Sequence, residues 1–329
     1  MGRSRKRQHE DDGADEKPRL SKKQKMKLKK QQHLEKMIEE FKNTTSPDPC
    51  PLCGHGNAPY LAYGHDRPYY QCTRCEMIFI PHNFRIPVSE EAALYQRHEK
   101  DAEDEGFKKF TSQLTQPLVK ALQTRGSTPE DATSLEAQLT NAHVTGEEPW
   151  AKIGLDYGSG PGPAIGPMLE HQGFNIIEYD PYAFPTPVLE TAVEDAIQAE
   201  PPAEALACVA DKDLITPSTS TSAFEENFSK LPEALRTQYA FITLTEVLKN
   251  VRNPLFVWQH LYSLLRKGGV LAILGAVCVD ASKFDTWHYH RDKSHIVFYT
   301  PKTLEYVAKL FSWKLVKTLN SNVYFFVKE

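Results

Sequence analysis

A glycine-rich turn at residues 155–162 constrains the fold of this chain more than any other feature. It follows an apolar run that predicts a β-strand, and it reads Leu155-Asp156-Tyr157-Gly158-Ser159-Gly160-Pro161-Gly162. Alternate glycines permit a sharp turn and bring the backbone against a ligand with no Cβ in the way. A dinucleotide-binding loop needs the spacing G-x-G-x-x-G, but its third glycine would fall on Pro163 or Ile165. The spacing therefore disfavours a nicotinamide cofactor.

Strand and helix patterns alternate from Ala151 onward, which predicts a mostly parallel sheet covered by helices on both faces. The expected strands cover residues 152–156, 175–179, 207–210, 239–244, 270–274, 313–318 and 323–327. A short polar connection joins the last two strands, which are predicted to form a hairpin. The expected fold class is therefore α/β, with a doubly wound, mostly parallel, seven-stranded Rossmann-like sheet over residues 150–329. Residues 184–237 are expected to be partly a surface insertion.

Four of the six cysteines form two C-x2-C pairs, and these four are Cys50, Cys53, Cys72 and Cys75. Inside a cell such pairs favour a metal over disulfides, and four thiolates are the ligand set of a structural, tetrahedral zinc site. Since protein would fill all four positions, no site for water remains and the zinc is assigned no catalysis. Residues 46–82 are too few to fold on an apolar core alone, so they are predicted to form a small zinc ribbon-like module, named the zinc module below.

Positive charge is concentrated at the N-terminus. Residues 1–42 hold 14 Lys and Arg against 8 Asp and Glu, although the whole chain has a net charge of −4. Residues 1–45 are therefore predicted to be a basic tail, either disordered or one solvated helix. Its lysine and arginine clusters are typical of a nuclear or nucleolar address, with the cytoplasm as a further location. Residues 83–149, after the zinc module, are predicted to be a helical linker.

Two classes of protein are excluded by the distribution of apolar residues. No run reaches the ~18 residues that a membrane span requires. The N-terminus has no apolar stretch of the kind that forms a secretory signal. We therefore expect an intracellular protein with no membrane partner.

The glycine-rich turn and two later features together resemble class I S-adenosylmethionine-dependent methyltransferases. The turn has the form D-x-G-x-G-x-G, and Asp180 closes the second predicted strand, where a carboxylate can accept hydrogen bonds from ribose hydroxyls. The later features are Thr245-Glu246-Val247-Leu248 after the fourth strand, then Asn253-Pro254 and Lys267-Gly268-Gly269. The resemblance implies that S-adenosyl-L-methionine is the cofactor. The residues expected to bind it are Asp156, Gly158, Gly160, Gly162, Asp180 and Thr245.

A closer resemblance, covering nearly everything after residue 48, is to an uncharacterised group of bacterial zinc-containing methyltransferases. It is carried by the cysteine pairs, the glycine-rich turn and five further segments. These are Tyr95-Gln96-Arg97-His98-Glu99, Tyr179-Asp180-Pro181, Thr245-Glu246-Val247, Trp287-His288-Tyr289-His290-Arg291-Asp292 and Ser294-His295-Ile296-Val297-Phe298-Tyr299. The group has no settled substrate, and the basic tail and the insertion lie outside the match.

Polar residues that follow the fifth main strand are the candidates for catalysis, because ligands of open α/β sheets bind beyond the carboxyl ends of the strands. Histidine is suited to removing a proton near neutral pH, which favours His290 or His295 as the base and Asp292 as its orienter. Trp287 is expected to form a wall of the acceptor pocket, and Glu246 is expected to line the cleft beside Thr245. The alternative is that the histidines only stabilise their loop.

The leading hypothesis for function is methylation of RNA, either transfer or ribosomal, with the zinc module and the tail engaging the polynucleotide. A second hypothesis is methylation of a small metabolite or sugar. A third is a non-catalytic RNA-binding scaffold that keeps the methyltransferase fold. The dependence of binding on salt separates the first two, because only polyanion binding weakens steeply with ionic strength. The acceptor atom and the oligomeric state stay open.

Overall fold

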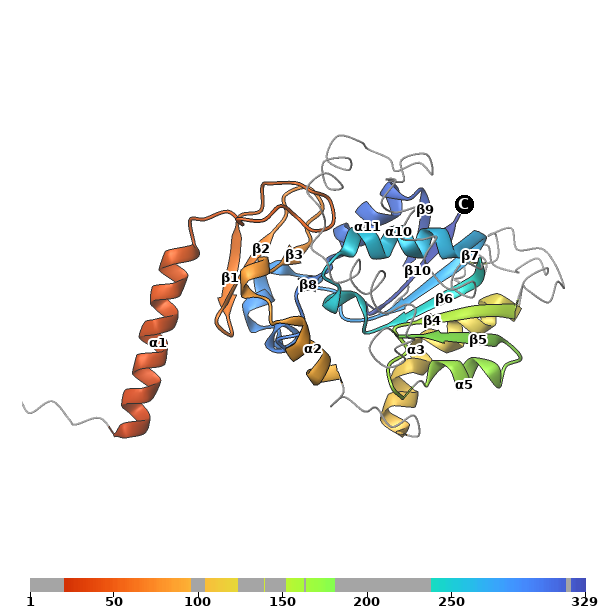
Figure 1. Ribbon diagram of the computed structural model, residues 1–329, viewed down its shortest axis with the longest axis horizontal. Coiled ribbons are helices and arrows are strands. Elements are labelled where there is room, and N and C mark those ends of the chain that lie inside the picture. The colour runs from red at the N-terminus through yellow and green to blue at the C-terminus, as the bar shows by residue number, and fades with distance from the viewer. Residues whose placement is uncertain are drawn as a thin grey trace, which may run out of the picture.

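Figure 1 shows the computed structural model of the chain. It describes residues 21–95, 104–123, 139, 152–162, 164–180, 238–317 and 321–329. The predicted strand at 207–210 and the predicted insertion at 184–237 lie outside the described residues, as do the basic residues before position 21.

A six-stranded sheet forms the centre of the molecule, in the order β5-β4-β6-β7-β10-β9. Its strands are β4 (Ile153–Tyr157), β5 (Asn175–Tyr179), β6 (Tyr239–Thr245), β7 (Leu265–Leu274), β9 (Trp313–Lys317) and β10 (Val323–Lys328). The first four are mutually parallel, whereas β10 is antiparallel to both β7 and β9. The expected fold class and the C-terminal hairpin are therefore confirmed.

The strand β7 is longer than the predicted strand at 270–274. Tyr239 of β6 pairs with Leu265, yet Phe241 pairs with Val270, so extra residues bulge out of β7 between the two pairs. Gly268 lies within this bulge with a positive φ of 71°. The Lys267-Gly268-Gly269 segment is thus a bulge inside a continuous strand, which glycine allows because it has no Cβ to clash in the left-handed region.

Helices cover both faces of this sheet, as the alternating pattern predicts (Figure 1). One face carries α3 (Glu105–Gln123) and α5 (Ile165–Glu170), and the other carries α10 (Pro254–Leu264) and α11 (Pro301–Leu310). Successive residues of a strand point to opposite faces, so Phe325 joins the core beneath α3 and Phe326 the core beneath α10. The helix α3 belongs to the segment that joins the zinc module to the sheet. It packs on β7 and α5, so it is part of the helical layer on that face of the sheet.

A second, four-stranded sheet has the order β1-β2-β3-β8. The zinc module supplies β1 (Tyr60–Gly64), β2 (Arg67–Gln71) and β3 (Ile78–Phe79). The fourth strand, β8 (Val297–Phe298), comes from the far end of the chain and pairs antiparallel with β3. The apolar residues of the module join the core beneath α10, so the module is packed onto the half of the molecule that contains the six-stranded sheet. A short helix, α2 (Val88–Tyr95), follows the module.

A long helix, α1 (Lys22–Phe41), projects from the zinc module (Figure 1). Ser21 and Gln24 form a reciprocal capping box at its start, which satisfies two otherwise unpaired backbone N–H groups. None of its residues is buried. Its C-terminal end docks on the zinc module, where the ring of Phe41 stacks on Tyr63 at 5.8 Å. For the helix described here, the solvated form of the predicted tail is the one observed.

Candidate active site

The glycine-rich turn leaves β4 and is held against the end of β5. The N–H of Gly158 donates to the carbonyl of Tyr179 at 2.6 Å, and the N–H of Gly160 donates to Asp180 Oδ2 at 2.9 Å. Both glycines have positive φ, 80° and 73°. The two segments expected to bind the cofactor therefore lie side by side at the carboxyl edge of the sheet.

Each of these glycines is needed for a different reason. A Cβ on Gly158 would lie 2.4 Å from Val247 Cγ2, closer than any real side chain approaches. A Cβ on Gly160 would meet nothing within 4 Å among the described residues. Gly158 thus permits close packing beneath the loop, and Gly160 faces open space where a ligand can approach the backbone. Gly162, further along the loop, is half-buried.

This edge of the sheet carries buried polar groups, two of which lack a hydrogen-bond partner among the described residues. Ser159 Oγ and Thr245 Oγ1 are buried and have no hydrogen-bond partner among the described residues. Asp156 is 3% exposed, and its carboxylate accepts from Thr243 Oγ1 at 2.7 Å. Buried hydroxyls that lack partners are uncommon in folded proteins and indicate that a ligand completes the site. The residues present fit a polar cofactor such as S-adenosylmethionine.

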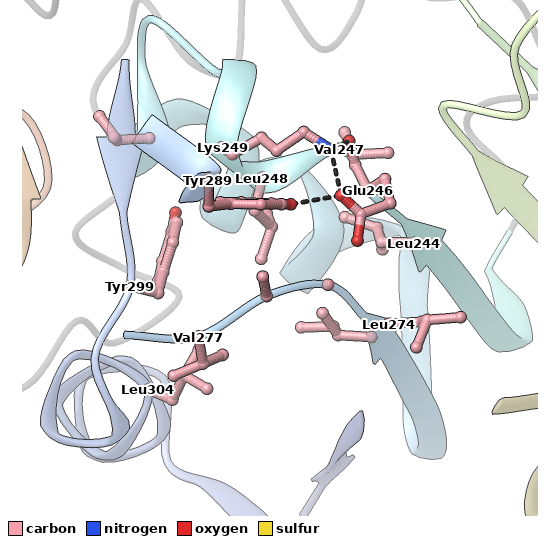
Figure 2. A pocket seen from close by; sticks show the side chains of 14 residues that line it. Leu244, Glu246, Val247, Leu248, Lys249, Leu274, Val277, Tyr289, Tyr299 and Leu304 are labelled. Carbon is pink, nitrogen blue, oxygen red and sulfur yellow. Dashed lines mark hydrogen bonds and ion pairs between the residues drawn. The ribbon is translucent and has the colours of Figure 1, made fainter. Parts of the chain in front are cut away.

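A pocket opens beside this loop, at the carboxyl ends of β6 and β7 (Figure 2). Most of its lining is aliphatic, with Glu246, Lys249, Tyr289 and Tyr299 as the charged and polar side chains. Glu246 follows β6 directly and has a positive φ of 59°, while its N–H donates to the carbonyl of Leu274 at 2.8 Å. A non-glycine residue in this conformation is strained, and such strain is concentrated at functional sites.

Two side chains, those of Lys249 and Tyr289, donate hydrogen bonds to the same carboxylate oxygen of Glu246. Both the Tyr289 hydroxyl and Lys249 Nζ donate to Glu246 Oε2, as the dashed lines in Figure 2 mark. Lys249 Nζ also donates to the backbone carbonyl of Glu246 at 2.9 Å. Burial, reinforced by the Glu246 charge, raises the pKa of Tyr289 well above its usual range, so Tyr289 keeps its proton and acts as a donor. The Glu246 carboxylate is therefore held by a cation and a hydroxyl.

The two candidate histidines lie in the loop next to this pocket but do not line it. His290 is 4% exposed, and its Nε2–H donates to the carbonyl of Asp285 at 3.1 Å. His295 Nδ1–H donates to the carbonyl of Tyr289 at 2.6 Å. Burial lowers the pKa of His295 to about 4, so its imidazole is neutral at pH 7 and only a weak base. In this structure both rings hold the loop together.

The two other candidates from this loop, Asp292 and Trp287, also lie outside the lining of the pocket. Asp292 Oδ1 accepts from the N–H of Ser294 at 2.9 Å, and Asp292 Oδ2 lies 3.9 Å from His295 Nε2. The indole of Trp287 stacks on Tyr289 at 5.0 Å with 24° between the rings. Trp287 is not among the residues that line the pocket, whereas Glu246 is. Of the five candidates for catalysis, Glu246 is the one that faces the pocket.

The four predicted zinc ligands come together in the zinc module. All four sulfur atoms lie within 4.8 Å of one another, and the pairs Cys50–Cys75 and Cys53–Cys72 are each separated by 3.5 Å. Zinc–thiolate bonds of about 2.3 Å in a tetrahedron place the sulfurs about 3.8 Å apart, so the cluster fits zinc. Burial raises the pKa of Cys50 and Cys75, so a bound cation is what would hold them as thiolates.

Reasoning from the sequence missed two pocket residues, Lys249 and Tyr289. Lys249 lies three positions after Glu246, a spacing that brings side chains together in a helical turn. Tyr289 lies between two histidines, and the acid–base chemistry of histidine favoured His290 as the candidate instead. A tyrosine next to a loop histidine carries no pattern that separates a pocket residue from a packed one.

A search of curated proteins found no match. Among solved structures, the crystal structure of coclaurine N-methyltransferase bound to N-methylheliamine and SAH is similar, with 14% identity and a TM-score of 0.26. That match covers 70% of this chain and 73% of the other. No helix of the described part is long and apolar enough to cross a membrane.

A family described as methyltransferase domain matches residues 120–318. The match includes the glycine-rich turn, Asp180, the Glu246 pocket and the loop that carries Tyr289. It spans more than half of the 329 residues, so this chain belongs to the methyltransferase domain family.

Proposed function

We propose that this methyltransferase transfers the methyl group of S-adenosylmethionine to RNA, either transfer or ribosomal RNA. The methyltransferase part rests on the family. The observation that supports RNA as the substrate class is the exposed helix α1, in which six lysines occupy residues 22–30 with no acidic residue among them.

The shape of α1 suits a polyanion better than a small metabolite. At about 1.5 Å per residue its 20 residues extend roughly 30 Å. The lysines lie in the first part of the helix, at residues 22–30, and are exposed to solvent. Phosphates one step apart along a nucleic acid attract such a row of cations, and each neutralised phosphate releases counterions. Since only Phe41 and its neighbours dock on the zinc module, the lysines lie away from the pocket and bind beside the modified nucleotide.

The cofactor residues have separate tasks in this proposal. Gly158 and Gly160 let the backbone approach the amino-acid part and ribose of the cofactor, and Asp180 accepts from the ribose hydroxyls. Ser159 and Thr245 offer the unpaired hydroxyls of the floor. When bound, the cofactor supplies an electrophilic methyl group for an in-line displacement, whose rate depends chiefly on positioning.

Glu246 is the residue of this chain that we assign to the acceptor. It lines the pocket, and the hydroxyl of Tyr289 and the ammonium of Lys249 fix its carboxylate. A fixed carboxylate orients a nucleophilic N–H or O–H by accepting its hydrogen bond, and it takes the proton as the methyl bond forms. His295 does not line the pocket and is therefore a weaker candidate for this step.

The first experiment is calorimetric titration of the zinc-loaded protein with S-adenosylmethionine. We expect micromolar binding that Asp180→Ala and Asp156→Ala abolish and that Asp285→Ala, an exposed change in the neighbouring loop, leaves unchanged. Absence of binding to the wild type would contradict the enzyme proposal and leave a scaffold.

The substrate class is tested by methyl transfer to total transfer RNA and ribosomal RNA at increasing salt. Replacement of Lys22, Lys23, Lys25 and Lys27 by Gln should weaken RNA binding and flatten its dependence on salt, by about 0.9 in log–log slope for each lysine that contacts duplex phosphate. Lys267→Gln with Lys283→Gln, two exposed lysines on the catalytic half, is the matched control. Transfer to small acceptors alone, without salt dependence, would favour the metabolite or sugar alternative.

The same lysine-rich segment also supports a nuclear or nucleolar location, which we include in the proposal. A fluorescent fusion of residues 1–45 should accumulate in the nucleus, and the fusion with the lysines of α1 changed to Gln should not. An even distribution of the unaltered fusion would contradict this part.

A further inference from the structure

Arg67 of β2 is a buried cation whose partners are carbonyl groups 223 to 228 residues further along the chain. It is 4% exposed. Its Nη1 donates to the carbonyls of Lys293 and His295 at 2.8 and 3.4 Å, and its Nη2 donates to those of His290 and Asp292 at 2.9 and 3.0 Å. Four carbonyls of one short loop are therefore gathered around one guanidinium.

Other contacts fasten the same loop to the zinc module. The hydroxyl of Tyr69, two residues after Arg67, donates to the carbonyl of His290 at 3.1 Å. The N–H of Ile80 donates to the carbonyl of Ile296 at 3.1 Å, and the β3–β8 ladder continues from there. The loop at 290–298 thus follows the surface of the module along its length.

The same loop is also continuous with the pocket. Tyr289 immediately precedes it and donates to Glu246 across the pocket. The carbonyl of Tyr289 accepts from His295, and the N–H of Ile296 donates to the carbonyl of Lys249 at 2.9 Å. A shift of the loop would therefore move Tyr289 and loosen its contact with Glu246.

We propose that Arg67 is a positioning residue, through which the zinc module sets the acceptor side of the active site. The inference rests on the proposed function, in which Glu246 faces the acceptor. The zinc module then fixes the position of the loop at 287–296, in addition to any contact with a substrate. Zinc would stabilise this arrangement, since Arg67 lies on β2, which ends directly before Cys72.

The chemistry of arginine supports a geometric role over a merely stabilising one. Arg67 forms no ion pair among the residues that the structure describes, so burial of its charge is offset by carbonyl dipoles and by the Tyr69 ring, whose centroid lies 5.7 Å from the guanidinium carbon. An apolar side chain would fill the same space without that cost. The planar fork reaches four carbonyls at once, which the single ammonium of lysine does not do.

The test compares Arg67→Met and Arg67→Lys with the wild type and with Lys302→Met. The control removes another contact between the module and the catalytic half, the exposed ion pair of Lys302 with Glu76 at 2.6 Å. Readouts are zinc content, calorimetry with S-adenosylmethionine, hydrogen exchange of the peptide that spans 286–297, and methyl transfer to total RNA.

We expect Arg67→Met to retain zinc and to bind S-adenosylmethionine within about twofold of the wild type. Hydrogen exchange in the 286–297 peptide should quicken by roughly tenfold or more. Turnover should fall by roughly tenfold to a hundredfold, since small misplacement of catalytic groups has effects of that size. Arg67→Lys should be intermediate, and Lys302→Met should match the wild type in every readout.

Unchanged exchange of this peptide in Arg67→Met would overturn the proposal. Loss of zinc from both Arg67 variants would also overturn it, because Arg67 would then stabilise the module itself. If the wild type transfers no methyl group to RNA, the proposed substrate fails separately, because exchange and cofactor binding still report on the loop.

Discussion

The two sides of the active site are built from different kinds of contact. On the cofactor side, the hydrogen bonds that hold the glycine-rich turn join residues about twenty positions apart, as from Gly160 to Asp180, although the buried Asp156 accepts from Thr243, 87 positions away. On the acceptor side, they join Tyr289 to Glu246 and Arg67 to His290, with 43 and 223 positions between partners. The glycine-rich turn is thus a local structure, whereas the acceptor side depends on the assembly of the whole chain.

This difference implies that the two sides fail separately. A local turn keeps its shape as long as β4 and β5 pair, whereas the acceptor loop needs the zinc module folded and docked. Changes in the zinc module should therefore affect turnover more than cofactor affinity, and changes in the glycine-rich turn should do the reverse.

The largest expected effect is that of Cys72→Ser, which removes a ligand from the predicted zinc site. Structural zinc contributes roughly 10 kcal/mol or more to the folding of small modules, so we expect loss of the metal and unfolding of residues 46–82. Metal content by mass spectrometry and thermal unfolding measure this. Cys278→Ser is the control, because the Cys278 thiol is buried outside the cysteine cluster.

The comparison is sharpened by titrating Cys72→Ser with S-adenosylmethionine. Retained affinity together with lost turnover would support two separable sides. One zinc per chain and unchanged unfolding in Cys72→Ser would contradict the metal assignment altogether.

Glu246→Gln should have the next largest effect. The amide keeps the size of the side chain but is no longer a base, so turnover should fall by roughly 10²- to 10⁴-fold while cofactor affinity stays the same. Tyr289→Phe removes one of the two donors that hold the carboxylate and should lower turnover by less. Steady-state kinetics and calorimetry separate the two parameters, with the exposed change Glu170→Gln as control. Full turnover in Glu246→Gln would remove Glu246 from the chemistry.

The same contrast explains what could be predicted from the sequence. Strand positions such as 175–179 and the glycine-rich turn follow from short-range patterns, because hydrophobic alternation and positive φ at glycine are local properties. The pairing of β3 with β8 and the contact of Arg67 with the loop have no local signature. Arg67 looks like any surface arginine in the sequence, and only the folded chain shows that it is buried.

Gly158→Ala tests the cofactor side directly. The left-handed backbone costs a residue with a Cβ roughly 1–2 kcal/mol, and the clash with Val247 adds a comparable amount, so affinity for S-adenosylmethionine should fall by roughly a hundredfold. Gly173→Ala is the matched control, because Gly173 also has a positive φ of 83° but open space around it and lies in the turn before β5. Equal loss of affinity in both variants would show that backbone strain alone, and not the site, is responsible.

The smallest expected effect is on the dependence of stability on pH. Burial lowers the pKa of both His260 and His295 to about 4, against about 6.5 in an unfolded chain. Between these values the unfolded state binds more protons, so stability is fully present above pH 6.5 and is lost as the pH falls towards 4. Each histidine should account for roughly 2 kcal/mol of the loss between pH 6.5 and 5.

The two histidines lie on different sides of the active site, so the effect of pH reports on each side separately. His260 packs on Tyr157 at the end of β4, on the cofactor side, whereas His295 holds the acceptor loop. Denaturant unfolding at a series of pH values should show a slope reduced by one proton in His260→Phe, which keeps the aromatic contact. The protection factor of the 286–297 peptide in hydrogen exchange should still fall in that variant as the pH falls, because His295 is intact. An unaltered slope would mean that His260 is not the buried neutral base that the structure describes, whereas a peptide insensitive to pH would remove His295 from the control of the acceptor loop.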